Sequence, residues 1–481
     1  MAVCALRTRL VIGLAVATIA VAGATAALGV SSSGTITTIA GTGVQGFSGD
    51  GGPATAAKLY APTGVAVDAQ GNVYIADHSG SRVRKVNREG TISTFAGTGG
   101  AGYSGDGGPA TSARVGTPYG VAVDRQGNVY ITDRYNNRVR KVSPGGTITT
   151  FAGTGAYGSG SFGDGGPATS AQLRNPYGVA VDGQGNVYIA DHDHFRVRKV
   201  SPTGTITTFA GTGVQGFSGD GGRATAAKLF SPFGLAVDEK GNVYIADRDN
   251  NRVRKVSPSG TITTFAGTGE AANDGDGDGG PATSARIQHP QGMVVDPQGN
   301  VYISAGGSVR KVSPGGTITT FAGGGRANPG DGGPATSALL RAPDGLALDR
   351  LGNLYIAEGW GRVRKVTADA GLTLTLGGAS TQQLLTQKGI TVTATCNTSC
   401  SLAASGSVTI LGTKYVFGLS RATAKLAAGK RTLVLHCPGT EQKRFRKLLK
   451  PGQRARAVIT VKATDKAGNT TKSKRTVAVR A

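Results

Sequence analysis

Apolar residues alternate with polar residues in short runs along most of this chain. Val65 and Val67 form one such run, and Val73 and Ile75 form the next. A period of two residues is typical of a strand with one buried face. Residues 68–72 lie between the two runs and include a glycine that can adopt positive φ, which indicates a tight turn. Similar runs follow at 82–86 and 91–96, so residues 65–96 predict a four-stranded antiparallel meander.

The same meander recurs six times between residues 34 and 368. Each copy carries a variant of the motif Gly-Val-Ala-Val-Asp-x-x-Gly-Asn-Val-Tyr-Ile-Ala-Asp, and successive copies are 53 to 58 residues apart. One meander cannot bury its faces alone, whereas copies packed around an axis bury each other. The pattern therefore predicts an all-β fold, a six-bladed β-propeller. The first aspartates of the six motifs are Asp68, Asp124, Asp182, Asp238, Asp296 and Asp349.

The fourth strand of the meander indicates how the ends of the repeat region meet. Its Thr-Ile-x-Thr pattern also occurs six times, but the first copy begins at Thr35, ahead of the first repeat. The last repeat ends at Val366 without such a strand. We therefore expect residues 35–40 to pair with the last repeat and to remove two exposed sheet edges.

Residues 176–191 read Pro-Tyr-Gly-Val-Ala-Val-Asp-Gly-Gln-Gly-Asn-Val-Tyr-Ile-Ala-Asp, and residues 196–200 read Arg-Val-Arg-Lys-Val. These motifs resemble the NHL repeat, and the resemblance covers all six copies, roughly seventy per cent of the chain. The Gly-Asp-Gly-Gly-Pro-Ala-Thr insertions resemble those of bacterial secreted NHL proteins. The resemblance implies a binding or scaffolding propeller that recognises a protein, RNA or another ligand on one face. Related propellers include amidating lyases and lactonase or strictosidine-synthase-like hydrolases, so the fold alone does not fix the function.

A long glycine-rich loop precedes each first strand, as at 46–59. Pro53 and the small residues after it predict a single helical turn, which Asp50 is placed to cap. Because the loop joins an outermost strand to the next innermost strand, we expect six copies to ring one face around the central channel. Exposed aromatic residues beside glycine suit a protein or carbohydrate ligand. The alternative is that the loop aspartates only stabilise turns. The predicted ligand-binding residues are Phe47, Asp50, Tyr103, Asp106, Phe162, Asp164, Phe217, Asp220 and Asp331.

One loop copy has the spacing of a calcium site. Asp274, Asp276 and Asp278 alternate with glycine, and hard cations prefer such carboxylate oxygens. The sequence has Ala285 where an EF-hand would supply a bidentate glutamate, so a solvated acidic turn is the alternative. No cofactor other than calcium is expected. A zinc site built on His78 and His192 is disfavoured, because Arg134 and Arg248 occupy the equivalent positions of the second and fourth repeats.

The third strand of every repeat is basic. Arg82, Arg84 and Lys85 recur in nearly every copy. We expect the arginines to pair with acids at the end of the preceding strand, such as Asp77, Asp133, Asp191 and Asp247. The alternative is a surface for an anionic polymer. Nucleic acid is an unlikely partner for an exported protein.

The first 28 residues predict an export signal. Arg7 and Arg9 precede an uncharged run at 10–28 that ends in small residues. We expect cleavage and a secreted or cell-surface protein with no transmembrane span. The alternative is an uncleaved anchor, because the run just reaches the ~18 residues that cross a bilayer. Once Cys4 has left with the signal, we expect a local disulfide between Cys396 and Cys400, although Cys437 is an alternative partner for either.

Residues 371–481 differ from the repeats. Alternating runs at 372–376, 389–395, 407–417, 430–436, 455–464 and 475–479 predict an immunoglobulin-like β-sandwich, with a helix at 441–450. The sequence Thr-Asp-Lys-Ala-Gly-Asn at 464–469 resembles bacterial extracellular Ig-like modules. The chain has a formal net charge of +24, much of it here. We predict attachment to an anionic cell-envelope polymer, with solubility as the alternative role of the charge. The densest cluster is Lys443, Arg444, Arg446, Lys447, Lys450, Arg454 and Arg456.

These features favour an exported binding or scaffold protein. The repeats are nearly interchangeable, and residues 41–52 are identical to residues 211–222. An enzyme would need different polar residues that converge in the channel. The rival interpretation is a propeller lyase or a lactonase- or esterase-type hydrolase with a metal at the channel mouth. A ligand-sensing part of a larger signalling system is a third interpretation.

Overall fold

The computed structural model describes two parts of the chain. The first consists of residues 34–156, 162–271 and 275–367. The second consists of residues 374–377, 381–383, 389–396, 400–411, 416–426, 429–436, 439–448, 455–465 and 470–480. The predicted export signal lies outside the described residues. Within them, no helix is long and apolar enough to cross a membrane.

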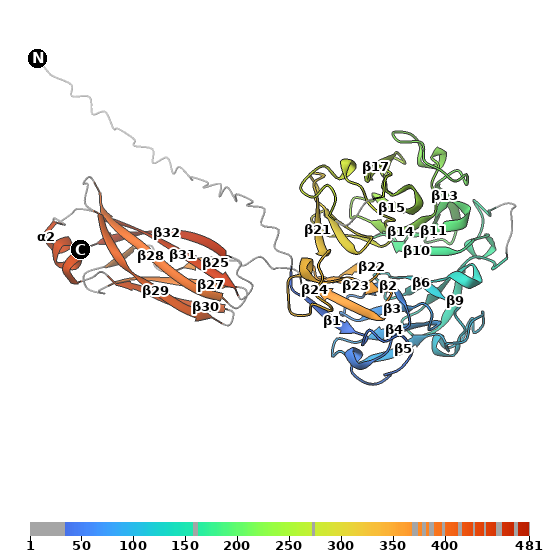
Figure 1. The fold of residues 1–481 in the computed structure, drawn as a ribbon, viewed down its shortest axis with the longest axis horizontal. Helices are drawn as coiled ribbons and strands as arrows, with labels where there is room; N and C mark the ends of the chain where they lie inside the picture. The colour runs from blue at the N-terminus through green and yellow to red at the C-terminus, as the bar shows by residue number, and fades with distance from the viewer. Residues whose placement is uncertain are drawn as a thin grey trace, which may run out of the picture. The chain divides into compact units, whose positions relative to one another are not determined.

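Each repeat folds into one four-stranded antiparallel sheet in which neighbouring strands follow one another along the chain, as predicted (Figure 1). Sheet 1 contains β2 (Pro62–Val67), β3 (Val73–Asp77), β4 (Arg82–Val86) and β5 (Ile92–Ala96). Sheet 2 contains β6 (Pro118–Val123), β7 (Val129–Asp133), β8 (Arg138–Val142) and β9 (Ile148–Ala152). Sheet 3 contains β10 (Pro176–Val181), β11 (Val187–Asp191), β12 (Arg196–Val200) and β13 (Ile206–Ala210). Sheet 4 contains β14 (Pro232–Val237), β15 (Val243–Asp247), β16 (Arg252–Val256) and β17 (Ile262–Ala266). Sheet 5 contains β18 (Met293–Val295), β19 (Val301–Ala305), β20 (Ser308–Val312) and β21 (Ile318–Gly323).

Sheet 6 combines the two ends of the repeat region. It contains β22 (Pro343–Leu348), β23 (Leu354–Glu358), β24 (Arg362–Val366) and β1 (Ile36–Ala40). β1 runs antiparallel to β24, with Ile36 opposite Val366. Both of these side chains are fully buried. The predicted pairing of the first strand with the last repeat is confirmed.

The turn between the first two strands is held by the aspartate of the repeated motif. In sheet 1, the carboxylate of Asp68 accepts hydrogen bonds from the backbone N–H groups of Gln70 and Asn72 at 2.9 and 2.8 Å. Gly71 adopts a φ of +87°, which a residue with a side chain rarely does. These contacts explain why Asp-x-x-Gly-Asn recurs in the motif.

The first strands of the six sheets lie next to one another around a common centre (Figure 1). A Cβ atom on Gly64 in β2 would lie 2.4 Å from the carbonyl oxygen of Tyr119 in β6. The series returns to its start, because a Cβ atom on Gly345 in β22 would lie 2.4 Å from the carbonyl oxygen of Thr63. Glycine is therefore required where one first strand approaches the next. An apolar cluster fills each of the six spaces between neighbouring sheets, including the space between sheets 6 and 1.

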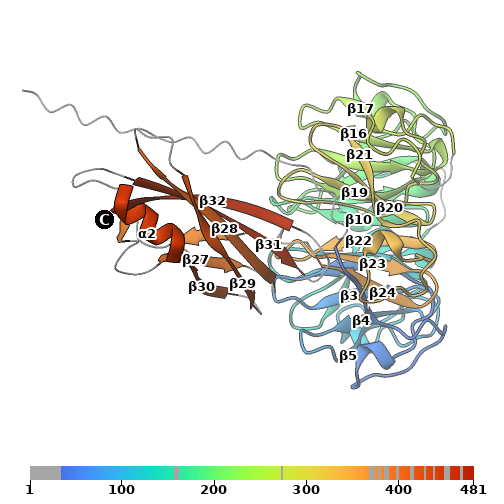
Figure 2. The ribbon, with the colours of Figure 1, turned by 60° about the vertical axis from the view of Figure 1, so that its left-hand side comes forward.

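Residues 374–480 form two further sheets and a helix (Figure 2). The three-stranded sheet contains β25 (Leu374–Gly377), β27 (Gly389–Cys396) and β30 (Gly429–His436). The five-stranded sheet contains β26 (Thr381–Gln383), β32 (Thr470–Arg480), β31 (Ala455–Asp465), β28 (Cys400–Ile410) and β29 (Val416–Leu426). The helix α2 (Gly439–Leu448) confirms the predicted helix with its bounds two residues earlier.

The expectation of one strand over 407–417 is wrong. These residues end β28 and begin β29, which pair with each other so that Thr409 lies opposite Val416.

A candidate binding site at the mouth of the central channel

The glycine-rich loops lie at the outer edges of the sheets. The N–H of Gly51 donates to the carbonyl of Ile92 at 2.8 Å, and the N–H of Ile92 donates to the carbonyl of Gly52 at 3.0 Å. Ile92 belongs to β5, the strand of sheet 1 farthest from the centre. The expectation that the loops ring the channel is therefore wrong. The reason is that the outermost strand has unpaired backbone groups, and the loop satisfies them.

Each loop contains a short 3-10 helix, as the predicted helical turn requires. In the loop before sheet 1 it is η1 (Ala54–Ala56), and Pro53 precedes it without any side-chain cap. The predicted capping role of Asp50 is thus wrong. The equivalent helices are η2 (Ala110–Ser112), η4 (Ala168–Ser170), η6 (Ala224–Ala226), η8 (Ala282–Ser284) and η9 (Ala335–Ser337).

The loop aspartate bonds to a buried arginine instead. The carboxylate of Asp50 accepts hydrogen bonds from Arg84 at 2.5 Å and from the hydroxyl of Thr94 at 2.6 Å. Partial burial acts to raise the pKa of Asp50, but hydrogen bonds from Thr94 and Arg84 lower it below its usual value overall. The same ion pair recurs as Asp106–Arg140, Asp164–Arg198, Asp220–Arg254, Asp278–Arg310 and Asp331–Arg364.

The predicted pairing of these arginines with acids at strand ends is confirmed. Arg140 lies 3.4 Å from Asp133, and Arg84 lies 3.9 Å from Asp77. The same contact joins Arg198 to Asp191, Arg254 to Asp247, and Arg364 to Glu358. In these sheets the arginine binds the end of the second strand and the outer loop at once, so its role is structural.

The predicted loop aromatics lie against arginines of the third strand. The guanidinium of Arg82 lies 3.8 Å from the ring centre of Phe47. Phe47, Tyr103 and Phe217 are exposed. The corresponding contacts are Arg138 with Tyr103, Arg196 with Phe162, and Arg252 with Phe217. Ligand binding by the loop residues stays a prediction, although their place is the outer edge.

The predicted calcium ligands are bonded to arginines in the described part of the chain. Asp276 accepts from Arg286 at 2.7 Å, and Asp278 accepts from Arg310 at 2.5 Å. Asp274 lies outside the described residues. Between 34 and 480, the described His, Cys, Asp and Glu residues include no group of three that fits a metal ion. Calcium would have to displace both arginines, and its binding stays a prediction.

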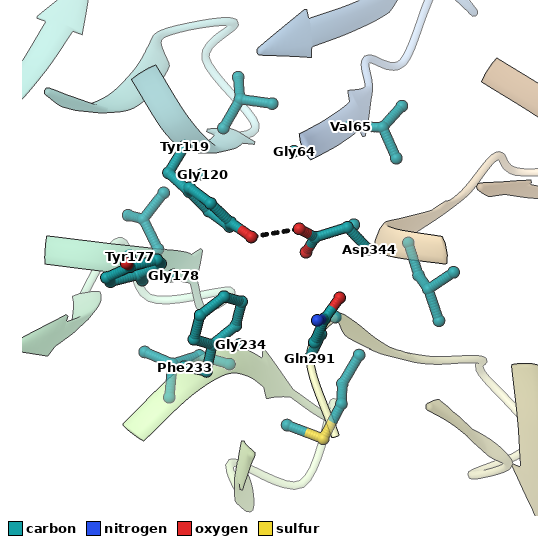
Figure 3. A pocket seen from close by; sticks show the side chains of 17 residues that line it. Gly64, Val65, Tyr119, Gly120, Tyr177, Gly178, Phe233, Gly234, Gln291 and Asp344 are labelled. Carbon is teal, nitrogen blue, oxygen red and sulfur yellow. Dashed lines mark hydrogen bonds between the residues drawn. The ribbon is translucent and has the colours of Figure 1, made fainter. Parts of the chain in front are cut away.

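A different set of residues meets at the centre of the ring. Pro-x-Gly begins the first strand of five sheets and directly precedes β18 in sheet 5, and the middle residue differs between most of the sheets. In sheets 2 to 6 this residue lines a central cavity (Figure 3). The lining leaves a cavity of about 70 Å³. The six middle residues are Thr63, Tyr119, Tyr177, Phe233, Gln291 and Asp344.

The channel residues contact one another across the centre. The hydroxyl of Tyr119 in sheet 2 donates to the carboxyl group of Asp344 in sheet 6, the two sheets that flank sheet 1 (Figure 3). Burial raises the pKa of Asp344 to about 7, against smaller opposing effects of Tyr119 and Arg248. Tyr177 lies 4.5 Å from Phe233 and 4.6 Å from Tyr119 between ring centres. The channel therefore has an aromatic side and a polar side.

A second set of residues surrounds the opening of the channel. These residues follow the second strand of each sheet, and that strand ends beside the start of the first strand, where Pro118 pairs with Asp133. We call this end of the sheets the mouth face. In sheets 2, 3 and 4 the residues begin the helices η3 (Arg134–Asn136), η5 (His192–His194) and η7 (Arg248–Asn250). From sheet 1 to sheet 6 the residues are His78, Arg134, His192, Arg248, Gly306 and Gly359.

The basic side chains of this set lie on the channel aromatics. The guanidinium of Arg134 is 4.7 Å from the ring centre of Tyr177, and the imidazole of His192 is 4.4 Å from it. Arg248 lies 5.5 Å from the ring centre of Phe233. Burial, together with the nearby charge of Arg134, lowers the pKa of His78 to about 4. The mouth therefore carries guanidinium groups on sheets 2 and 4, imidazoles on sheets 1 and 3, and glycine on sheets 5 and 6.

Exposed apolar side chains also gather on the mouth face. Among residues 34–367 of the described chain, the large exposed apolar residues lie in the outer loops or in the turns after the second strand, with one exception, Leu351. Leu351 lies in the turn after the first strand of sheet 6, on the opposite face. Tyr60, Tyr135 and Trp360 lie beside or in the turns after the second strands, on the mouth face, whereas Val44, Phe47, Tyr103, Val214 and Phe217 lie in the outer loops.

The channel residues and most of the mouth residues were not predicted from the sequence as a site. Alignment of the six repeats gives a usable signal, because Pro and Gly are constant on either side of a variable position. Near-identity elsewhere in the repeats obscured it.

The predicted basic cluster of the second part is described in part. Lys443, Arg444 and Lys447 are exposed on α2, and Arg456 is exposed on β31. The side chains of Arg446, Lys450, Arg454, Cys396 and Cys400 lie outside the described residues, and so does Cys437. The anionic-polymer site and the disulfide stay predictions.

The chain has relatives among curated proteins. Teneurin-1 of Mus musculus is 32% identical over 248 residues, which are 46% of this chain and 9% of teneurin-1. Teneurin-4 of Mus musculus is 34% identical over 245 residues, which are 45% of this chain and 9% of teneurin-4. The chain thus spans about a tenth of the length of these relatives.

Two solved structures share the propeller fold. One is described as an auxiliary nutrient binding protein from Bacteroides thetaiotaomicron, with a TM-score of 0.50 and 16% identity over 69% of this chain and 75% of that one. The other has the same description, comes from Bacteroides ovatus, and has a TM-score of 0.50 and 17% identity over 69% of this chain and 76% of that one. At this level of identity the likeness shows the fold alone.

The family model of the teneurin NHL domain matches five successive segments. These are residues 30–104, 99–161, 155–218, 212–274 and 265–328, which together cover more than half of the chain. The repeated four-stranded sheets agree with the β-propeller of NHL proteins. This chain belongs to the teneurin NHL domain family.

Proposed function

We propose that this chain is an exported, non-enzymatic binding protein of the bacterial secreted NHL type. Its six sheets are the blades of a closed six-bladed propeller that recognises a protein or glycan ligand on the mouth face. The second part is a basic Ig-like module that attaches the protein to an anionic polymer of the cell envelope.

The observation that carries this proposal is the variable position of Pro-x-Gly. The scaffold uses the same residues in nearly every repeat for its turns, its buried arginines and its sheet contacts. The channel position has a different role, because in sheets 2 to 6 it supplies tyrosine, phenylalanine, glutamine and aspartate to one cavity. Ligand sites are typically concave and largely apolar with a few polar groups, and this mouth has that composition.

The exposed apolar residues support the same face. Tyr60, Tyr135 and Trp360 are exposed on this face, whereas Leu351 is exposed on the opposite face. Exposed aromatic and arginine side chains are characteristic of recognition surfaces. We therefore place the ligand on the mouth face, over the channel.

A screen of glycans and acidic and neutral peptides against the full chain tests this placement. We expect the screen to find a ligand for the wild-type chain. The variant Tyr177→Ala should bind this ligand at least tenfold more weakly, because Tyr177 contacts Arg134, His192 and Phe233 at the mouth. Leu351→Ala is the matched control, since it removes an exposed apolar side chain from the opposite face. Equal weakening by both variants, or by neither, would overturn the proposal.

A propeller lyase or hydrolase is the second candidate. The convergence of unlike polar groups, with Asp344 buried beside Tyr119, favours it. The mouth supplies the two imidazoles of His78 and His192, and Arg134 stands between them in the series of sheets. Turnover of the ligand found in the screen, lost on removal of bound metal, would establish the enzyme and overturn the binding role.

Attachment to the envelope rests on exposed charge. The triple variant Lys443→Glu, Arg444→Glu and Lys447→Glu reverses three exposed cations on α2. We expect it to release the full chain from isolated cell envelopes at a lower salt concentration than the wild type, because screening weakens charge attraction. The control reverses three exposed cations on β31 and β32, Lys462, Lys472 and Lys474. Equal release of both variants would contradict a localised site.

A further inference from the structure

Arg134 differs from the buried arginines of the third strands. Those arginines bond to carboxylates of the outer loop and in most sheets lie close to a second acid. Arg134 lies on the ring of Tyr177, and no carboxylate of the described residues lies within 4.0 Å of it. Its Nε is buried and has no hydrogen-bond partner within the described chain; the Nε atoms of the third-strand arginines also have none, but those arginines are held by ion pairs through their other nitrogens. A buried donor without a partner is costly, and an acceptor from a ligand would satisfy it.

Two neighbours of Arg134 have the same deficit. The Nε2 of His78 and the Nε of Arg248 are also buried, and neither has a hydrogen-bond partner among the described residues. The ring centres of His78 and Tyr119 are 5.6 Å apart, and the guanidinium carbon of Arg248 is 5.5 Å from the ring centre of Phe233. Tyr119, Tyr177 and Phe233 contact one another. The three side chains of Arg134, His78 and Arg248, each with a nitrogen that is unpaired among the described residues, therefore surround one aromatic cluster at the mouth.

The described acidic residues near the mouth do not form an ion pair with Arg134. Asp193 bonds to His192 at 2.6 Å, Asp249 bonds to Arg248 at 2.7 Å, and Asp344 accepts from Tyr119. None of them reaches Arg134. The positive charge of Arg134 is thus uncompensated by an ion pair within the described residues.

We propose that the channel mouth binds one carboxylate group of the ligand, held by Arg134 with help from Arg248 and the imidazoles of His78 and His192. This inference rests on the proposed function, because it names the chemical group that the mouth face recognises. A guanidinium presents parallel N–H donors that match the two oxygens of a carboxylate.

The size and charge of the site favour a carboxylate over a phosphate. The channel cavity of about 70 Å³ is lined by residues such as Tyr177 and Phe233, and Arg134 and Arg248 lie on those two rings. A small end group held by the arginines therefore lies next to this cavity. Sheets 5 and 6 have Gly306 and Gly359 at the equivalent position, so this position contributes no side chain there. Asp344 lines the same cavity, and it opposes a doubly charged group more strongly than a singly charged one.

The test is a titration of the full chain at pH 7 with small probes. Calorimetry measures the binding, and the NMR signals of the imidazoles report its location. The probes are D-glucuronate, N-acetyl-L-glutamate α-amide, inorganic phosphate and neutral D-glucose. We expect one or both carboxylates to bind and to shift the signals of His78 and His192, with glucose inert. Stronger binding of glucuronate would point to an acidic glycan, and stronger binding of the glutamate derivative would point to an acidic protein segment. Tighter binding of phosphate, or equal binding of glucose, would overturn the proposal.

Substitutions locate the site. Arg134→Gln should weaken carboxylate binding at least tenfold. Arg125→Gln is the matched control, because Arg125 is an exposed arginine of the same repeat in the turn after β6, on the opposite face. Arg134→Lys keeps the charge without the paired donors and should weaken binding to an intermediate degree, and it serves as the test if Arg134→Gln does not fold. Unchanged affinity in the Arg134 variant that folds would overturn the inference.

The two proposals fail in different ways. If the ligand from the screen loses affinity in Tyr177→Ala but keeps it in Arg134→Gln, the mouth face recognises ligands and the carboxylate site is wrong. If glucuronate or the glutamate derivative binds through Arg134 while the screen finds no ligand, the anion site stands and the recognition function is wrong.

Discussion

The fully buried guanidinium of Arg84 donates to the carboxylate of Asp50 at 2.5 Å, although the two residues are 34 positions apart. This bond ties the outer loop to the third strand of sheet 1. The same relationship occurs in all six sheets, and it explains both the basic third strand and the aspartate of the loop.

Removal of Asp50 should destabilise the fold. In Asp50→Ala the buried Arg84 keeps only the more distant Asp77, at 3.9 Å, as a charged partner. Loss of a hydrogen-bond partner of a buried charged group costs about 1–3 kcal/mol. Urea unfolding should show that loss, whereas Glu239→Ala, which removes an exposed acid in a turn, should be nearly neutral. Equal stability of the two variants would show that the ion pair does not hold the loop.

The pairing of β1 with β24 should be a main source of stability in the repeat region. Ile36 is fully buried beside Val366, Leu346 and Leu354 in the cluster between sheets 5 and 6. Ile36→Ala should lower the free energy of unfolding by about 2–5 kcal/mol, because it removes apolar contacts and leaves a cavity. Thr37→Ala, at the next and less buried position, is the control. A loss below that of Thr37→Ala would contradict the pairing.

Asp344 should make stability depend on pH. Burial raises its pKa to about 7 from an ordinary value of 3.8, so the folded state binds this proton more tightly than the unfolded state. Its stabilising contribution is therefore complete below about pH 4 and is lost as the pH rises through 7. Each unit of pKa shift corresponds to ~1.4 kcal/mol. Urea midpoints between pH 4 and 8 should fall more for the wild type than for Asp344→Asn, and parallel curves would contradict this.

The aromatic contact of α2 should hold the helix on its sheet. Phe445 is fully buried and lies 5.2 Å from Phe417 of β29 between ring centres. Phe445→Ala should cost about 3–5 kcal/mol in the stability of the second part. Lys447→Ala, which changes an exposed residue of the same helix, is the control. Circular dichroism during urea unfolding distinguishes the two, and a neutral Phe445→Ala would show that the helix is not packed there.

The sequence predicted the elements whose pattern is local. The alternation around Val65 and Ile75 and the Asp68 turn predicted the strands, and the extra strand at Thr35 predicted the pairing of β1 with β24. The pairing of Arg140 with Asp133 was predictable because the two residues recur together in the repeats.

The course of the outer loop was not predictable in the same way. It depends on backbone hydrogen bonds between Gly51 and Ile92, which no side-chain pattern specifies. The channel site was missed for a different reason. Its residues, such as Tyr119 and Asp344, are far apart in the chain, and their meeting depends on the ring of six sheets.

Hydrogen exchange of the full chain, with and without the ligand found by the screen, tests the central claim most directly. We expect the ligand to slow exchange at the mouth, in residues 117–121, 134–137, 192–195 and 248–251, because these segments carry the channel and mouth residues. Protection confined to the turns of the opposite face, such as 68–72 and 349–353, would contradict recognition at the mouth.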